Sequence, residues 1–223
     1  MILCIETSAT LSSVALSDGS QRLAATENFQ AEHILTLIDD LLQEAGVTAK
    51  DIDVLAVSVG PGRFTGLRIG VAVAQGLAFA WHKKVIAIDS LAILAQGVYK
   101  RHGEEKVIVA MDARKEEVYR HSFIWDGEIM VSQRDLSIIS AKKAWSHSTE
   151  WAAAGDGFIQ YPLLAKGLKT CYISPSDRLP YAEDMISLAR RAYKDKKELK
   201  PEQILPNYLR EEIVTSNNTE PGV

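Results

Sequence analysis

Short apolar runs separated by polar turns open the chain, a pattern typical of β-strands. Residues 2–5 are apolar and end at Glu6, residues 13–16 are strand-like, and Asp18-Gly19 is a turn signal. The pattern predicts two strands joined by a polar loop and followed by a hairpin turn.

The same layout returns in the second half of the chain. Residues 107–111 are apolar and end at Asp112, residues 118–125 are strand-like, and Asp126-Gly127 turns the chain into a further strand at 128–131. The acidic residue precedes the Asp-Gly turn by a similar number of positions in both places. This predicts one structural unit used twice.

Helical periodicity marks the longer segments. Residues 31–45 carry apolar side chains three and four positions apart and stop at a glycine, which predicts an amphipathic helix. An apolar strand at 54–59 leads through Gly60-Pro61-Gly62 into a helix expected over 65–81, with Thr65 as its N-cap. A last helix is expected over 183–197.

Together these elements predict an α/β protein of two lobes, residues 1–101 and 102–223, each a mixed sheet flanked by helices. The boundary falls in a charged, glycine-containing stretch at 99–106, and the polar residues 215–223 are expected to form a frayed tail. The chain has 223 residues, 47% of them apolar, which is enough to build such a core.

The charge balance excludes a strongly basic protein. The net charge is −4, with 25 Lys and Arg against 29 Asp and Glu, so any role on RNA would depend on a partner.

Cys4 and Cys171 form no CxxC pair, which fits two inert thiols in a reducing compartment. No basic signal segment opens the chain and no apolar stretch is long enough to span a bilayer, so a cytoplasmic protein is expected, without a membrane partner.

Few residues suggest metal or nucleophilic catalysis. None of the five histidines lies within four positions of another, so the sequence predicts no transition-metal site. Four serines could be considered as nucleophiles: Ser8, Ser12, Ser13 and Ser58. No GxSxG motif is present and no histidine is placed to activate any of them, which argues against a serine hydrolase. Gly155-Asp156-Gly157 could face a nucleotide, although a plain strand-to-helix turn is the commoner use of this pattern.

Glu6 and Asp112 each close a strand at the start of one lobe, where a cleft between the lobes would lie. In a phosphotransferase such carboxylates hold a metal ion or orient a water molecule. In the alternative, each carboxylate accepts hydrogen bonds from N–H groups of the loop that follows it. We favour this second role and expect alanine at either position to change stability more than chemistry.

Small residues repeat every four positions after the glycine-rich loop, at Gly66, Gly70 and Ala74. Such a stripe lets another backbone approach closely. The loop lacks the P-loop lysine and the GxGxxG pattern, and its only cations are Arg63 and Arg68. The segment therefore predicts packing or association rather than phosphate binding by this chain alone.

Six motifs together resemble the TsaB family, also called YeaZ, over nearly the whole chain: ILCIETSATLSSVALSDG, SVGPGRFTGLRIGVAVAQGLAFA, IDSL, MDARKEEVY, AGDG and PNYLR. The resemblance implies the two-lobed actin/Hsp70/sugar-kinase (ASKHA) fold and a part in making threonylcarbamoyladenosine beside the anticodon of tRNA. It also implies the paralogous enzyme TsaD as partner, with the ATPase TsaE joining the pair. ATP and metal are then expected on TsaD, with no cofactor bound by this chain alone.

TsaD-like chains follow the equivalent helix with His-x-x-x-His, whose imidazoles bind the catalytic metal. Here the matching segment VIAIDSLAIL places Ser90 and Leu94 at those positions. Leucine has no lone pair for a metal, and a serine hydroxyl is a poor transition-metal ligand. The resemblance thus implies a non-catalytic scaffold that activates TsaD and reaches tRNA through the complex.

Two enzymatic alternatives remain open at this point. One is an ATP-dependent phosphotransferase or carbamoyltransferase that uses Glu6 and Asp112 in the cleft between the lobes. The other is a metallopeptidase, against which the missing histidine pair argues.

The resemblance also implies that helices of the first lobe mediate association, with TsaD or with a second copy of the chain. The candidate interface residues on the two helices are Leu35, Ile38, Leu42, Gly66, Gly70, Val73, Ala74 and Leu77. The alternative is that both helices are simply buried in their own lobe.

Overall fold

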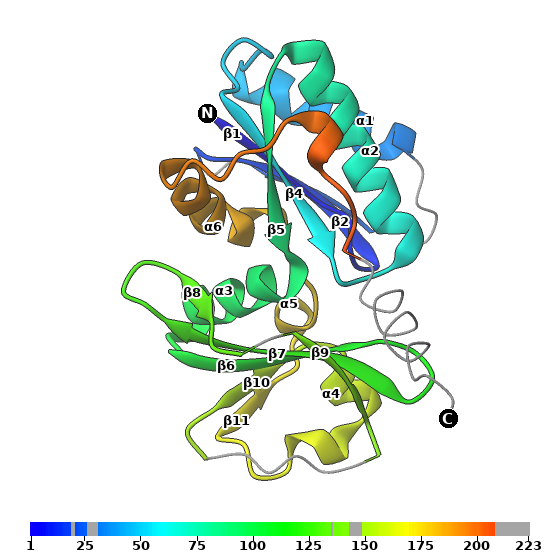
Figure 1. Ribbon diagram of the computed structural model, residues 1–223, viewed down its shortest axis with the longest axis vertical. Helices are drawn as coiled ribbons and strands as arrows, with labels where there is room; N and C mark the ends of the chain where they lie inside the picture. Colours follow the sequence, from blue (N-terminus) through cyan, green and yellow to red (C-terminus); the bar gives the residue numbers. More distant parts are fainter. Residues whose placement is uncertain (19–20, 26–30, 135, 143–148, 208–223) are drawn as a thin grey trace, which may run out of the picture.

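Two β-sheets, one from each half of the chain, lie one above the other with helix α3 (Ser90–His102) between them (Figure 1). This computed structural model describes residues 1–18, 21–25, 31–134, 136–142 and 149–207. The expected tail at 215–223, part of the PNYLR motif and the second residue of the first Asp-Gly turn lie outside the described residues.

The first sheet has the strand order β3-β2-β1-β4-β5. Strand β1 pairs antiparallel with β2 and parallel with β4, and β5 continues the parallel edge. The sheet's strands are β1 (Ile2–Glu6), β2 (Leu11–Leu16), β3 (Gln21–Ala25), β4 (Val54–Gly60) and β5 (Lys84–Asp89).

The second sheet repeats this connectivity. Strand β6 pairs antiparallel with β7 and parallel with β10, β11 continues the parallel edge, and β8 and β9 both pair with β7 on its other side. Its strands are β6 (Lys106–Asp112), β7 (Glu117–Trp125), β8 (Met130–Ser132), β9 (Ser137–Ser140), β10 (Ala152–Ala154) and β11 (Thr170–Tyr172). The predicted duplication and the two-lobed ASKHA-like α/β fold are therefore confirmed.

The helices agree with the predicted periodicity but differ at their ends. Helix α1 spans Ala31–Ala45 as predicted, whereas α2 spans Phe64–Trp81 and α6 spans Ala182–Lys194. The predicted N-cap Thr65 is wrong, because Arg63 holds that position and makes no side-chain cap. The described part of the chain also contains four short helices: α4 (Gly157–Gln160), η1 (Pro162–Ala165), α5 (Pro175–Arg178) and η2 (Pro201–Gln203).

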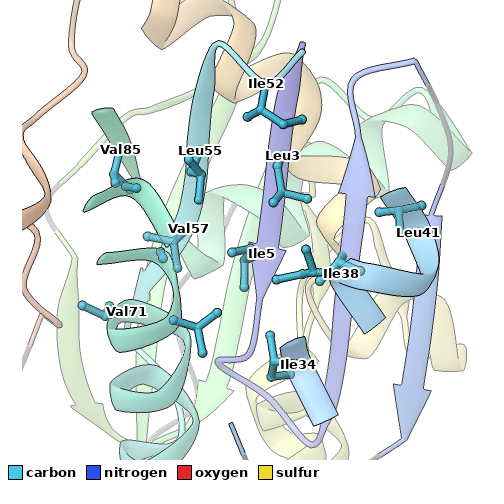
Figure 2. Close-up of a cluster of buried hydrophobic side chains, with 14 of the residues drawn as sticks. Leu3, Ile5, Ile34, Ile38, Leu41, Ile52, Leu55, Val57, Val71 and Val85 are labelled. Carbon is cyan, nitrogen blue, oxygen red and sulfur yellow. The ribbon is translucent and has the colours of Figure 1, made fainter. Parts of the chain in front are cut away.

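Strand β1 lies at the centre of the first lobe and is buried along its whole length. Because side chains alternate along a strand, Leu3 and Ile5 face α1 and α2, while Ile2 and Cys4 face α6 (Figure 2). Burial raises the pKa of the Cys4 thiol to about 12, so it stays protonated and inert. The apolar stripe of α1 thus covers one face of the sheet, and α6 covers the other.

The chain returns to the first sheet after it has built the second. The amide of Ala182 donates to the Ser13 hydroxyl at 2.9 Å, and Leu199 forms an antiparallel bridge with Val85. Further on, the Gln75 side chain donates to the carbonyl of Ile204 at 2.8 Å. The sequence repeat predicts a division between residues 101 and 102. In the structure, α6 and η2 come from the second half of the chain but pack on the first lobe.

Among the described residues, α2 is the one helix whose length and composition match a membrane span. It packs against β4, α1 and η2, and 39% of it is buried inside the fold. One side of α2 thus packs in the core of the first lobe.

Candidate interaction face and inter-lobe carboxylates

The eight candidate interface residues lie on α1 and α2, which pack against each other. Two of them reach the surface: Leu35 is 44% exposed and Leu77 is half-buried. The other six are buried in the chain's own lobe: Ile38, Leu42, Gly66, Gly70, Val73 and Ala74.

The stripe of small residues on α2 rests on the end of β1. The Thr7 hydroxyl donates to the carbonyl of Gly66 at 2.9 Å, and a Cβ atom on Gly70 would lie 2.1 Å from the same hydroxyl oxygen. A Cβ atom on Gly62 would lie 2.4 Å from the carbonyl oxygen of Ser8. The stripe on α2 is therefore packed against the Thr7 side chain, just beyond β1, and the close backbone approach occurs at Gly62 in the loop before the helix.

The outward side of α2 carries a second small stripe that sequence reasoning missed. Ala72, Gly76 and Ala80 recur at four-residue spacing, and all three are exposed. A Cβ atom built on Gly76 would meet nothing within 4 Å. Phe79 beside this stripe is 76% exposed and Phe64 at the start of the helix is 53% exposed. The spacing was visible in the sequence, but which of the two stripes faces outward was not.

Glu6 lies at the end of β1 with no exposed surface. Its Oε1 accepts a hydrogen bond from the amide of Ser8, while its Oε2 and the Ser8 hydroxyl have no partner among the described residues. Burial raises the pKa of this carboxyl to about 7, opposed in part by the hydrogen bond from the Ser8 amide. Glu6 is therefore closed off from any ligand between the lobes in this structure.

The raised pKa of Glu6 predicts that the free energy of unfolding decreases as the pH rises from 4.5 to about 8. Protonated Glu6 stabilises the fold fully below its ordinary pKa of 4.5, and this contribution is lost as the pH rises through about 7. The shift corresponds to about 3 kcal/mol. Glu6→Gln should remove this slope and be the more stable protein at pH 8, in urea unfolding measured at several pH values. Parallel pH curves for the two proteins would contradict the assignment.

Asp112 occupies the matching position in the second lobe. Its Oδ1 accepts from the amide of Arg114 at 3.1 Å, two residues on, as Glu6 accepts from Ser8. The amide of Asp112 donates to Asp156 at 3.0 Å, and burial raises the pKa of the Asp156 carboxyl. The prediction that each carboxylate binds its own loop is confirmed.

The Gly155-Asp156-Gly157 turn packs directly on β6. Gly155 has a φ of +112°, and a Cβ atom there would lie 2.1 Å from the carbonyl oxygen of Ala110. Because glycine alone adopts this conformation without strain, the motif is explained by a tight strand-to-helix turn.

Asp89 joins the two lobes, a role that the sequence did not reveal. Its Oδ1 accepts from the amides of Leu91 and Ala92 at the start of α3. Its Oδ2 lies 3.2 Å from Nδ1 of His121 on β7, and Nε2 of that imidazole lies 2.7 Å from the Ser132 hydroxyl. An aspartate before a helix is a recognisable N-cap signal, but its histidine partner comes from the other sheet.

The resemblance described above places Ser90 and Leu94 where TsaD-like chains have their histidine pair. Both side chains are fully buried, and the Ser90 hydroxyl has no hydrogen-bond partner among the described residues. Within the described ranges, no three His, Cys, Asp or Glu side chains gather as a metal site would require. These donors do not fit a transition metal.

Comparison with known proteins agrees with this architecture. Residues 24–207 match the family model described as TsaD, tRNA N6-adenosine threonylcarbamoyltransferase. The tRNA threonylcarbamoyladenosine biosynthesis protein TsaB of Escherichia coli K12 is 34% identical, with 95% of each chain covered. The protein of the same name from Haemophilus influenzae is 32% identical, with 95% of this chain and 94% of that one covered.

Solved structures give the same picture. YeaZ from Pseudomonas aeruginosa superimposes with a TM-score of 0.84 at 35% identity and covers 93% of this chain and 99% of its own. A second Pseudomonas aeruginosa structure, described as similar to the peptidase YeaZ, has a TM-score of 0.86 at 35% identity, covering 94% and 99%. Near-complete coverage, identities above 30% and the shared fold establish that the chain belongs to the TsaB (YeaZ) family.

Proposed function

We propose that the chain is a non-catalytic subunit that binds and activates a TsaD-type threonylcarbamoyltransferase, with TsaE joining the pair, during formation of threonylcarbamoyladenosine in tRNA. One observation carries the proposal: the chain matches the TsaD family model over residues 24–207 but has buried Ser90 and Leu94 where the resemblance places the metal-binding histidines. The names of its relatives support the same reaction. ATP and metal belong to the partner, and the complex works in the cytoplasm.

The outward side of α1 and α2 is the proposed docking face. It combines the exposed Leu35 and Phe79 with the stripe of Ala72, Gly76 and Ala80, along which a partner helix can approach closely. Exposed apolar surface of this kind marks interaction sites on soluble proteins. The predicted interface residues Leu35 and Leu77 lie at the surface, and the six buried ones support the two helices from beneath.

Gly76→Arg should weaken association without unfolding the chain. The arginine would stand on the exposed stripe, where nothing lies within 4 Å of a Cβ atom, and hold a partner helix away. We expect at least tenfold weaker binding to the TsaD-type partner, or to a second copy, in size exclusion with light scattering, at an unchanged melting temperature.

Gly76→Ala is the matched control for this test. It should keep association and stabilise the helix by up to about 1 kcal/mol, because alanine has the higher helix propensity. Normal association of the folded arginine variant would place the interface elsewhere.

Reconstitution tests the activity itself. Purified TsaD-type enzyme and TsaE should form threonylcarbamoyladenosine on tRNA only when this chain is added. Modification by this chain alone would show that it is an enzyme, and full activity without it would remove the proposed role. Calorimetry of the isolated chain with ATP and magnesium tests the phosphotransferase alternative.

A further inference from the structure

Two lysine-rich segments, far apart in sequence, meet beside the edge strand β5. Residues 82–84 follow the end of α2, and residues 194–200 begin at the last residue of α6. The amide of Val85 donates to the carbonyl of Leu199 at 2.9 Å, and the amide of Leu199 donates back at 2.8 Å. Figure 1 shows the chain after α6 crossing β5 toward α2. The crossing places the two lysine runs next to each other.

We define the lysine patch as Lys83, Lys84, Lys194, Lys196, Lys197 and Lys200. Lys83 is half-buried and the other five are exposed. The carboxylates on these segments are Asp195, Glu198 and the nearby Glu202, half the number of the lysines. In a chain with a net charge of −4, this is a local concentration of positive charge.

Only two of the six patch lysines form ion pairs with carboxylates among the described residues. Lys84 pairs with Glu198 at 3.1 Å, and Lys197 lies 3.7 Å from Asp195, which Arg191 also contacts at 3.3 Å. The remaining patch lysines have no ion pair within the part of the chain that the structure describes: Lys83, Lys194, Lys196 and Lys200. These four ammonium groups are available to an external anion.

We propose that the lysine patch binds the phosphate backbone of the tRNA, an inference that rests on the proposed function. Lysine is a flexible point charge suited to phosphate contacts, which position a nucleic acid without reading its sequence. The patch therefore holds the RNA while the catalytic partner acts on the base.

The position of the patch fits simultaneous binding of partner and RNA. Helix α6 lies on the face of the first sheet opposite to α1 and α2. A partner docked on the outward side of α1 and α2 thus leaves Lys194, Lys196 and Lys197 at the end of α6 uncovered, while Lys83, Lys84 and Lys200 lie beside the end of α2 and border the docked partner. This explains how a chain of negative net charge contributes to RNA binding: the local charge, rather than the total, meets the phosphates.

The test compares two double variants of equal charge. Lys83→Glu/Lys196→Glu alters the patch, and Lys50→Glu/Lys166→Glu alters two exposed lysines elsewhere for which the described residues show no ion pair. Binding of a tRNA transcript is measured by fluorescence anisotropy from 50 to 300 mM KCl, with the full chain alone and with the catalytic partner. The patch variant should bind about tenfold more weakly at 100 mM salt, with a salt slope shallower by about 2. The control should stay within about twofold of wild type.

Each other outcome overturns the inference. Equal affinities for the two double variants, or no tRNA binding by the wild-type chain and its complex, would show that the patch does not hold RNA. Binding to vesicles containing phosphatidylserine, with no binding to tRNA, would assign the patch to a membrane instead. Partner binding is measured by light scattering on the same samples. If the proposed function is wrong, light scattering will show that the wild-type chain does not bind the catalytic partner. If only the role of the lysine patch is wrong, the patch variant will bind the partner and will bind tRNA as tightly as wild type does.

Discussion

Arg101→Ala is expected to destabilise the protein by about 2–3 kcal/mol, because it removes the cation that two buried carboxylates share and leaves Asp184 with Lys100 and Asp177 with His102. The Arg101 guanidinium donates to Asp177 at 3.0 Å and to Asp184 at 2.8 Å, and both aspartate side chains are at most 2% exposed. Burial by itself would raise the pKa of Asp177, but hydrogen bonds from Ser174, Arg101 and His102 bring it below its ordinary value.

This network also connects the two lobes. Asp184 belongs to α6, which packs on the first sheet, and Asp177 belongs to α5, whose carbonyl accepts from the amide of Gly155 beside the second sheet. Arg101 at the end of α3 holds both. We therefore expect the loss of Arg101 to loosen the lobes as well as lower the free energy of unfolding.

Urea unfolding measures the effect, with Arg191→Ala as the matched control. Arg191 contacts three carboxylates, whose side chains are 26%, 52% and 35% exposed, so its loss should cost less than about 1 kcal/mol. Equal costs for the two variants would show that the buried network contributes no more than a surface one.

Ala74→Arg is expected to prevent folding. Ala74 has no exposed surface and packs in the main core cluster with Val71 and Ala78 (Figure 2). An arginine there would bury an unpaired charge and displace its neighbours, at a cost of more than about 4 kcal/mol.

Ala72→Arg is the matched control for this variant. Ala72 lies two positions earlier on α2 and is exposed, so the same side chain should leave the melting temperature unchanged. Circular dichroism and size exclusion distinguish the two proteins. A normally folded Ala74→Arg variant would show that the inward side of α2 is not part of the core.

The candidate sites show where reasoning from sequence reaches its limit. Glu6 and Asp112 were found from their repeated place after a strand, and their loop hydrogen bonds follow from local geometry, two residues apart. The partner of Asp89, His121, was not found, because 32 positions of chain separate them and they belong to different sheets. The lysine patch was missed for the same reason, since two segments form it only when Leu199 pairs with Val85.

The sequence by itself determined the two repeated units and the positions of α1, β4 and α2 to within a residue or so. These features depend on interactions between neighbours in the chain, which leave a periodic or spacing signal. Only the tertiary structure decided which stripe of α2 faces β1, which sheet α6 covers, and which charges meet. An amphipathic helix shows that it has a buried side, but the surface that buries it is set by long-range packing.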